Sequence, residues 1–294
     1  MTRTKIEYDH YVDFALDRAQ EYIQENLSPN HTGRLDGKNP EETVEIEGYL
    51  RSNPYSTAEM RETIVKMLKD IVGVADGSSG GKRTITYLSG ALGSKDELRE
   101  FAGNSEYNNP AIENLRQELS SVVASDFAFM KALYTNYTGE STEPYGKVRA
   151  LLSGIDQTIS QIVKDHKLSL IVDNTLAAVN EADGKSIIQT LAAYKADYNL
   201  QIYAMALTER EAETLAEKHG LDPKEAKKTA VGFNKMFYSL CQVASDVVLL
   251  DRKGTIIYEQ KNGKIVQEDL KRLSSWNRHF APVGSTNRPS FNPE

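Results

Sequence analysis

The stretch from Arg83 to Arg99, with the sequence RTITYLSGALGSKDELR, has residue types that could bind and transfer phosphate. Its first part has the apolar content of a buried strand, and small residues then form a turn that includes Gly90, Gly93 and Ser94. Lys95 follows directly and opens a predicted helix. Backbone N–H groups at such a helix start, together with an ammonium group, bind phosphate favourably. We therefore take Gly90, Gly93, Ser94 and Lys95 as candidate phosphate-binding residues.

This turn departs from the phosphate-loop pattern G-x-x-x-x-G-K-[ST]. When the pattern is aligned on Lys95, serines occupy both glycine positions and Asp96 occupies the position of the hydroxyl residue. When it is aligned on Gly90 and Gly93, one residue is missing before the lysine. The departure leaves open whether the turn is a working phosphate loop, a degenerate one or an unrelated turn.

Two further predicted strands end in polar side chains that suit the same chemistry. One ends at Asp126, and the other ends at Asp173, with Thr175 two residues later. Ligands of open parallel sheets bind beyond the carboxyl ends of the strands, so we expect these residues to gather near Lys95. Phosphoryl transfer needs a cation on the phosphates and a carboxylate that accepts the proton of the attacking hydroxyl. Lys95 would bind phosphate, Asp126 would be the general base, and Asp173 would hold a metal-bound water or the acceptor.

Each of these residues also has a purely structural interpretation. Lys95 could be a solvated charge at the start of a helix, and Asp126 could be the N-cap of the helix that follows it. Asp173 and Thr175 could simply terminate their strand. The presence of all three sites at predicted strand ends favours the chemical interpretation.

The order of predicted elements indicates an α/β fold. Helices and strands alternate from residue 83 onward, which predicts a parallel sheet with helices on both faces. LSLIVD at residues 168–173 is its strongest strand, because it is apolar on both faces. The runs DVVLLD and TIIYEQ predict a closing β-hairpin, followed by a helix near residues 267–275.

The N-terminal part of the chain has a different pattern. Amphipathic helices are predicted over residues 5–27 and from Ser56 onward, with a loop over residues 28–55. The tract GSSGG follows the second helix and is typical of a linker. The predicted organisation is a helical segment at 1–81, an α/β domain at 82–281 and a disordered tail at 282–294.

Composition excludes several classes of protein. The net charge of −7 over 294 residues argues against a nucleic-acid partner. No apolar run is long enough to span a membrane, and the start of the chain has no signal-peptide pattern. The single cysteine, Cys241, favours a reducing compartment, so we expect a cytoplasmic protein, with a secreted effector as the alternative. The five histidines have no metal-ligand spacing.

The strand ends and the closing hairpin together resemble the zeta toxin family of bacterial P-loop kinases. The resemblance covers roughly residues 83 to 260 and is most specific at the end, where DVVLLDRKG leads to a strand that ends in Tyr258. It implies a P-loop kinase-like fold that uses ATP or GTP with Mg²⁺ to phosphorylate a hydroxyl of a UDP-sugar or a similar small molecule. It also implies an antitoxin or another protein partner.

The resemblance assigns roles to individual residues. It places Asp126 as the base and puts Asp173 and Thr175 on the acceptor. The Mg²⁺-ligating position falls on Asp96. In the region where the family has phosphate-binding arginines, this chain offers Arg210, very early in its predicted helix, and the lysines Lys218, Lys227 and Lys228. A lysine lacks the two-pronged donor geometry of arginine.

Three functions remain open on the sequence. The first is a nucleotide-dependent kinase. The second is a catalytically degenerate relative that keeps the fold and binds a partner or another ligand. The third is an effector module whose N-terminal helices do the binding. Those helices would either cover the nucleotide site in the same chain or only pack against the sheet.

Overall fold

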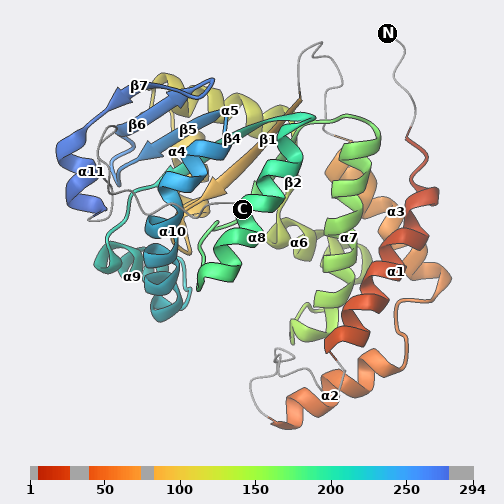
Figure 1. Cartoon of the computed structure of the whole chain (residues 1–294). Coiled ribbons are helices and arrows are strands. Elements are labelled where there is room, and N and C mark those ends of the chain that lie inside the picture. Colours follow the sequence, from red (N-terminus) through yellow and green to blue (C-terminus); the bar gives the residue numbers. More distant parts are fainter. Residues whose placement is uncertain (1–5, 27–39, 74–82, 278–294) are drawn as a thin grey trace. The chain divides into compact units, whose positions relative to one another are not determined.

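The computed structural model describes residues 6–26, 40–73 and 83–277, in two compact units (Figure 1). The first unit comprises Met1–Gly77 and Val123–Leu168, and the second comprises Ser78–Val122 and Ser169–Glu294. The sequence-based division at residue 81 differs from this one, because residues 123–168 belong with the N-terminal helices. The predicted GSSGG linker and the predicted disordered tail at 282–294 lie outside the described residues.

The first unit is almost entirely helical. Its elements in chain order are α1 Asp9–Asn26, α2 Pro40–Arg51, α3 Ala58–Val72, β2 Val123–Ser125, α6 Phe127–Thr138 and α7 Gly146–Asp165. Helix α1 runs against α7 at close range, and a Cβ on Gly154 would lie 2.2 Å from the carbonyl oxygen of Ala15. The small residues Ala15 and Ala19 are buried at this contact. Because α7 offers its apolar face to α1, the middle of the chain joins the N-terminal helices.

Helix α2 corrects the expected loop over residues 28–55. Pro40 lies at the first helical position, where its missing N–H costs nothing, and Glu41 and Glu42 lie in the first turn. Ile46 and Leu50, one turn apart, are buried. The few apolar residues that suggested a loop therefore form the buried side of an amphipathic helix.

The second unit is an α/β domain built on a mainly parallel sheet. Its elements are β1 Arg83–Ser89, α4 Ser94–Gly103, α5 Pro110–Ser121, β3 Leu170–Asp173, α8 Glu181–Lys195, β4 Tyr198–Met205, α9 Glu209–Lys218, α10 Pro223–Val243, β5 Asp246–Leu250, β6 Ile256–Lys261, β7 Lys264–Glu268 and α11 Leu270–Trp276. The strands of this unit follow the order β3-β1-β4-β5-β6-β7. The pairs from β3 to β5 are parallel, and β6 and β7 are antiparallel additions.

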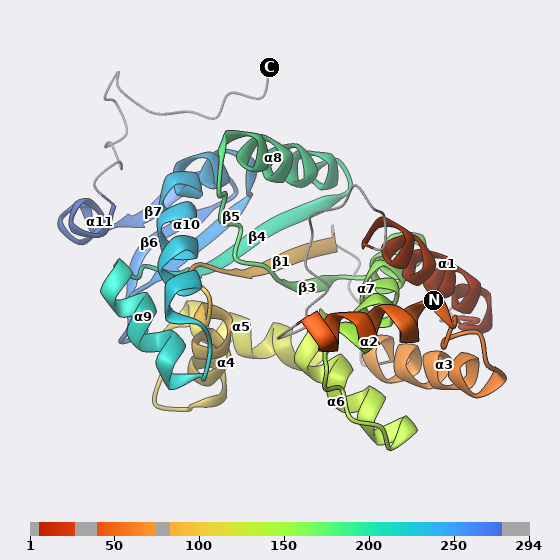
Figure 2. The same cartoon turned by 90° about the horizontal axis from the view of Figure 1, so that it is seen from below.

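Helices cover both faces of this sheet (Figure 2). Helices α4 and α5 lie on one face, and α8 and α10 lie on the other. The predicted fold class, a parallel sheet with helices on both faces and a terminal β-hairpin, is confirmed. Because β3, β1 and β4 are parallel, their carboxyl ends lie at one edge of the sheet, and the loop after β1 lies between the ends of β3 and β4.

The sequence did not predict strand β7; a helix was expected there from about residue 267. Asn262 and Gly263 both have positive φ, at 51° and 74°, and join β6 to β7 as a two-residue hairpin turn. Asn-Gly is the strongest short sequence signal for such a turn. The strand is hard to recognise because Ile265 and Val266 remain exposed at the sheet edge. Within the described residues, no helix is long and apolar enough to cross a membrane.

Candidate functional site

The turn between β1 and α4 has the backbone shape that its glycines allow. Gly90 has φ of 122° and Gly93 has φ of 92°, both in the left-handed region that residues with a Cβ rarely adopt. A Cβ on Gly90 would lie 2.8 Å from the Ser94 Oγ and 3.3 Å from the Met205 carbonyl oxygen. Gly93 is the N-cap residue of α4 and has no side chain to accept the helix N–H groups. The turn therefore directs the chain into α4 with the helix start uncapped by a side chain.

Several N–H groups of this turn already have acceptors within the chain. The Gly90 N–H donates to the Thr175 carbonyl oxygen at 3.3 Å, and the Leu92 N–H donates to Thr229 Oγ1 at 2.8 Å. Thr229 lies on α10, and this helix therefore accepts a hydrogen bond from the loop. The Ser94 N–H donates to the Ala91 carbonyl oxygen at 2.9 Å. These N–H groups of the loop are therefore hydrogen-bonded within the chain.

Two leucines complete the cover of the loop. Gly93 is buried, and a Cβ there would lie 3.5 Å from Leu221 and 3.6 Å from Leu215. Leu215 belongs to α9, and Leu221 lies in the link to α10. We call α9, α10 and their link the α9–α10 hairpin. This hairpin covers the loop in the structure.

The Ser94 hydroxyl is a polar atom with an unmet hydrogen bond. Ser94 is 1% exposed, and its Oγ has no hydrogen-bond partner. A buried hydroxyl without a partner is costly in a folded protein. Ser94 therefore has bonding capacity at the helix start that the chain itself does not use.

Two cations of α4 converge on the end of β3. Lys95 Nζ donates to Asp173 Oδ2 at 3.2 Å, and Arg99 Nη2 donates to Asp173 Oδ1 and Oδ2 at 3.0 and 3.2 Å. The Asp173 side chain is 6% exposed, while those of Lys95 and Arg99 are 31% and 27% exposed. A carboxylate this deeply buried is stabilised by its paired charges. Sequence reasoning missed Arg99, although its spacing of four residues from Lys95 places both cations on one side of the helix.

The expected convergence of the ends of β1 and β3 is therefore present. Lys95 contacts Asp173, and Gly90 contacts Thr175 through their backbones. The roles predicted for these residues in catalysis and binding stay predictions.

Asp126 lies in the first unit, at the end of β2. Its Oδ1 accepts hydrogen bonds from the N–H groups of Ala128 at 2.9 Å and Phe129 at 3.4 Å, so it is the N-cap of α6. The structural interpretation of Asp126 is thus present in the structure, and its role as general base stays a prediction. The preceding Ser125 hydroxyl donates to Asp156, and burial raises the pKa of that carboxyl group.

The remaining predicted site residues lie near the start of α4 and on α10. Asp96 lies in the first turn of α4 and is partly exposed, and its N–H donates to the Gly93 carbonyl oxygen at 3.1 Å. Lys227 pairs with Glu209 at 3.0 Å, and Lys228 pairs with Glu225 at 3.2 Å. Hydrogen bonding to Glu209 raises the pKa of Lys227. Both lysines thus neutralise carboxylates of the α9–α10 hairpin.

A hollow of about 460 Å³ lies at the same edge of the sheet, beyond the end of β4. Its lining includes the charged residues Glu209, Arg210 and Lys235, together with Asn234 and Trp276. The Asn234 Oδ1 atom is buried and has no hydrogen-bond partner. This hollow therefore has charged groups of both signs and one polar atom, Asn234 Oδ1, that could accept a hydrogen bond from a ligand N–H group.

Comparisons with known proteins give little further information. No family model matches the sequence, and no curated protein matches it. A chain from a study of the PezAT chromosomal toxin–antitoxin system of Streptococcus pneumoniae is similar in structure, with 14% sequence identity and a TM-score of 0.47. The similarity covers 70% of this chain and 81% of that chain. At these values we rest no argument on the match.

Proposed function

We propose that this protein is a nucleotide-dependent kinase that resembles the zeta toxins and transfers a phosphoryl group to a hydroxyl of a UDP-sugar or a similar small molecule. The observation that supports the proposal most is the arrangement of Lys95 beside Asp173. A lysine in the first turn of α4, after a turn with two positive-φ glycines, faces an aspartate at the end of the adjacent parallel strand. This combination supports the proposal, because a cation of a type that suits phosphate and a carboxylate lie together at the carboxyl edge of the sheet.

The residues present fit a nucleotide with Mg²⁺ in their chemistry. Mg²⁺ prefers oxygen ligands, and Ser94 supplies a buried hydroxyl without a partner, while Asp96 and Asp173 supply carboxylates. When bound, the ion would neutralise charge on the phosphates. Lys95 and Arg99 would bind the phosphate oxygens, with Asp173 orienting both cations. The proposed general base is Asp126, and Thr175 would contact the acceptor.

The hollow beyond β4 is our candidate site for the base of the nucleotide. The Asn234 Oδ1 atom there has no hydrogen-bond partner and can accept a hydrogen bond from an exocyclic amine. We assign the base of the nucleotide to this hollow. The protein partner in this proposal is an antitoxin, and the proposed compartment is the cytoplasm. Burial raises the pKa of the Cys241 thiol to about 12, which keeps this thiol protonated and unreactive.

A second candidate function is favoured by the covered loop. The Leu92 N–H bonds to Thr229, and Leu215 and Leu221 lie against Gly93. A degenerate relative that binds a partner and no nucleotide would keep this cover permanently. An active kinase must move the α9–α10 hairpin before phosphate can reach the loop.

Binding of ATP and GTP with Mg²⁺ to the full chain tests the proposal. Under the kinase proposal, nucleotide at about 100 times its Kd stabilises the protein by roughly 2.7 kcal/mol, measured as a rise in Tm. The Lys95→Met variant should lose this rise. The matched control is Lys185→Met in the same unit, whose lysine makes an exposed ion pair with Glu181 at 3.4 Å, and it should keep the rise.

Two results separate the candidate functions. If neither the wild type nor Thr229→Val, which removes the acceptor of the Leu92 N–H, binds millimolar nucleotide, the kinase proposal is wrong and the degenerate one stands. If nucleotide binds, radiolabel transfer from ATP to UDP-sugars tests catalysis. Asp126→Asn should then bind nucleotide normally and transfer no label, and unchanged transfer would exclude Asp126 as the base.

A further inference from the structure

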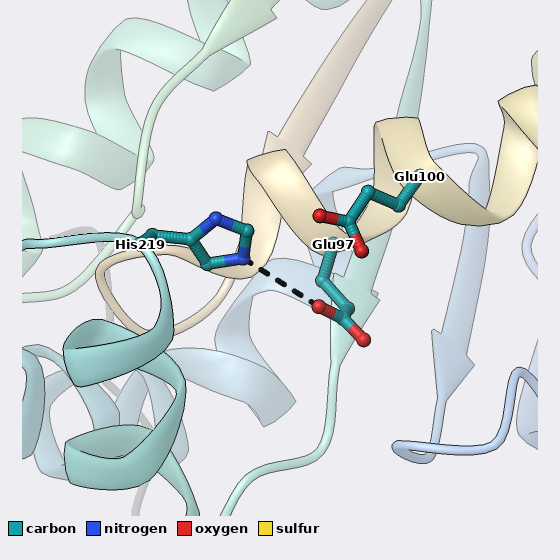
Figure 3. Close-up of side chains that lie close together, drawn as sticks. All are labelled: Glu97, Glu100 and His219. Atoms are coloured by element: carbon teal, nitrogen blue, oxygen red, sulfur yellow. Dashed lines mark ion pairs between the residues drawn. The ribbon is translucent and has the colours of Figure 1, made fainter.

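Three potential metal ligands come together between α4 and the end of α9 (Figure 3). Glu97 and Glu100 lie one turn apart on α4, so their carboxylates project on the same side of the helix. His219 is the C-cap residue of α9 and faces them. One ligand atom from each residue lies within 4.8 Å of the other two. All three residues belong to the second unit.

The histidine distinguishes this group from an ordinary acidic patch. Its Nε2 atom is buried and has no hydrogen-bond partner, and it lies 3.5 Å from Glu97 Oε2. Two ligand atoms on one tetrahedral Zn²⁺ ion, each about 2.0–2.2 Å from the metal, lie roughly 3.3–3.6 Å apart. The separation in the structure thus fits two ligands of a common ion, and it is too long for a good hydrogen bond.

Lys218 now supplies the positive charge at this place. Its Nζ donates to Glu97 Oε2 at 2.7 Å and to Glu100 Oε2 at 2.6 Å. The ammonium nevertheless leaves one of the two negative charges uncompensated and cannot satisfy His219, because the Nε2 atom gains no bond from it.

A divalent ion would compensate the remaining negative charge and would give His219 Nε2 a partner. Two carboxylates and one divalent cation are neutral, and a neutral imidazole can bind the ion through Nε2. The Lys218 side chain is 47% exposed, so it can turn into water and keep its hydration when it gives up the carboxylates. Mixed imidazole and carboxylate ligands suit Zn²⁺ among the common divalent ions.

We propose that Glu97, Glu100 and His219 form a binding site for a divalent transition metal, with Zn²⁺ as the best-suited ion, and that Lys218 is its internal competitor. A water molecule completes the four-coordinate shell. The bound ion links α4 to α9 and thereby fastens the α9–α10 hairpin over the loop. The proposal does not rest on the kinase proposal; if both hold, the bound ion opposes the movement of the hairpin that lets phosphate reach the loop.

Titration of ZnCl₂ into the metal-free full chain by calorimetry, without nucleotide, tests this site. We expect one ion per chain and a rise in Tm. His219→Gln should weaken binding at least about tenfold, as expected for loss of a ligand. Its matched control is His166→Gln, since His166 lies in the first unit and contacts Tyr11 instead. The control should leave the zinc affinity unchanged.

Lys218→Gln provides the sharpest test, because it predicts a gain. Removal of the competing ammonium should tighten Zn²⁺ binding by about tenfold or more, whereas a purely structural ion-pair cluster would only lose stability. Co²⁺ in place of Zn²⁺ should give visible absorption that His219→Gln changes. Equal zinc affinity in the wild type and His219→Gln, or no gain in Lys218→Gln, would overturn the proposal.

The test does not depend on a single variant folding. If His219→Gln fails to fold, Glu100→Gln replaces it, since the Glu100 side chain is 52% exposed and its loss should be tolerated. That variant should also weaken zinc binding, and an unchanged affinity would again refute the site. Failure of zinc to bind leaves the nucleotide experiments untouched, because they are done separately with Mg²⁺.

Discussion

Replacement of Asp173 by Asn tests the charge cluster at the end of β3. The substitution keeps the size of the side chain and removes its negative charge, which leaves Lys95 and Arg99 without their buried counter-ion. Removal of one member of a buried ion pair typically costs about 3–5 kcal/mol. The two cations are 31% and 27% exposed, so water can hydrate them in part. We therefore expect a smaller cost than for a fully buried pair, about 2–3 kcal/mol.

The single tryptophan of the chain makes this prediction measurable for the relevant unit. Trp276 is in the second unit and is 9% exposed, so its fluorescence reports the unfolding of that unit. With a urea m-value of about 2 kcal/mol/M, the midpoint of Asp173→Asn should fall by roughly 1–1.5 M. The same fluorescence measured against nucleotide concentration shows whether the variant still binds ligand.

A matched control separates burial from the mere presence of an ion pair. Lys228 and Glu225 are 3.2 Å apart, the same distance as Lys95 and Asp173, and their side chains are 70% and 47% exposed. Lys228→Gln should cost less than about 0.5 kcal/mol, as is usual for exposed pairs. If Asp173→Asn lowers the midpoint no more than Lys228→Gln does, the cluster does not hold the end of β3, and our reasoning is refuted.

Three further variants test other parts of the second unit. Burial raises the pKa of Glu118, so this carboxyl group binds a proton more tightly in the folded protein than in the unfolded one. The free energy of unfolding should therefore fall as pH rises from about 4.5 through the raised pKa. Urea unfolding at several pH values should show a weaker pH dependence for Glu118→Gln. Thr229→Val leaves the Leu92 N–H without its acceptor and should cost about 1–3 kcal/mol, measured by Tm, while an unchanged Tm would show that the hydrogen bond is dispensable. Gly93→Ala should cost about 1–2 kcal/mol; the cost comes from backbone strain at positive φ, since the added Cβ itself meets only ordinary contacts. The control Gly103→Ala, whose Cβ meets nothing within 4 Å, should be neutral or stabilising. Equal effects of the two substitutions would refute the strain argument.

Local signals in the sequence located most of the secondary structure. Thr208 caps α9 and Asp222 caps α10, as their positions before helical patterns predict. The buried run that ends at Asp173 forms a central parallel strand. Helix α2 was missed because its polar residues outnumber the two buried ones, Ile46 and Leu50, and a pattern that sparse does not stand out from a loop.

The organisation into units depended on packing between distant segments. The sequence placed the boundary at a Gly/Ser tract, since composition marks linkers well. The close approach of α7 to α1 instead joins residues 123–168 to the N-terminal helices, through the contact of Gly154 with Ala15 and Ala19. No local pattern encodes which apolar helix face meets which other face.

The sequence by itself determined the residue types at the strand ends and, through the alternation of elements, that the ends of β1 and β3 would meet. Only the tertiary structure decided their partners. It paired Lys95 and Arg99 with Asp173, directed the Leu92 N–H to Thr229, and brought His219 to Glu97 and Glu100. The physical reason is range. Periodicity and caps act over a few residues, whereas these contacts join positions about 70 to 140 residues apart, which only the folded domain brings together.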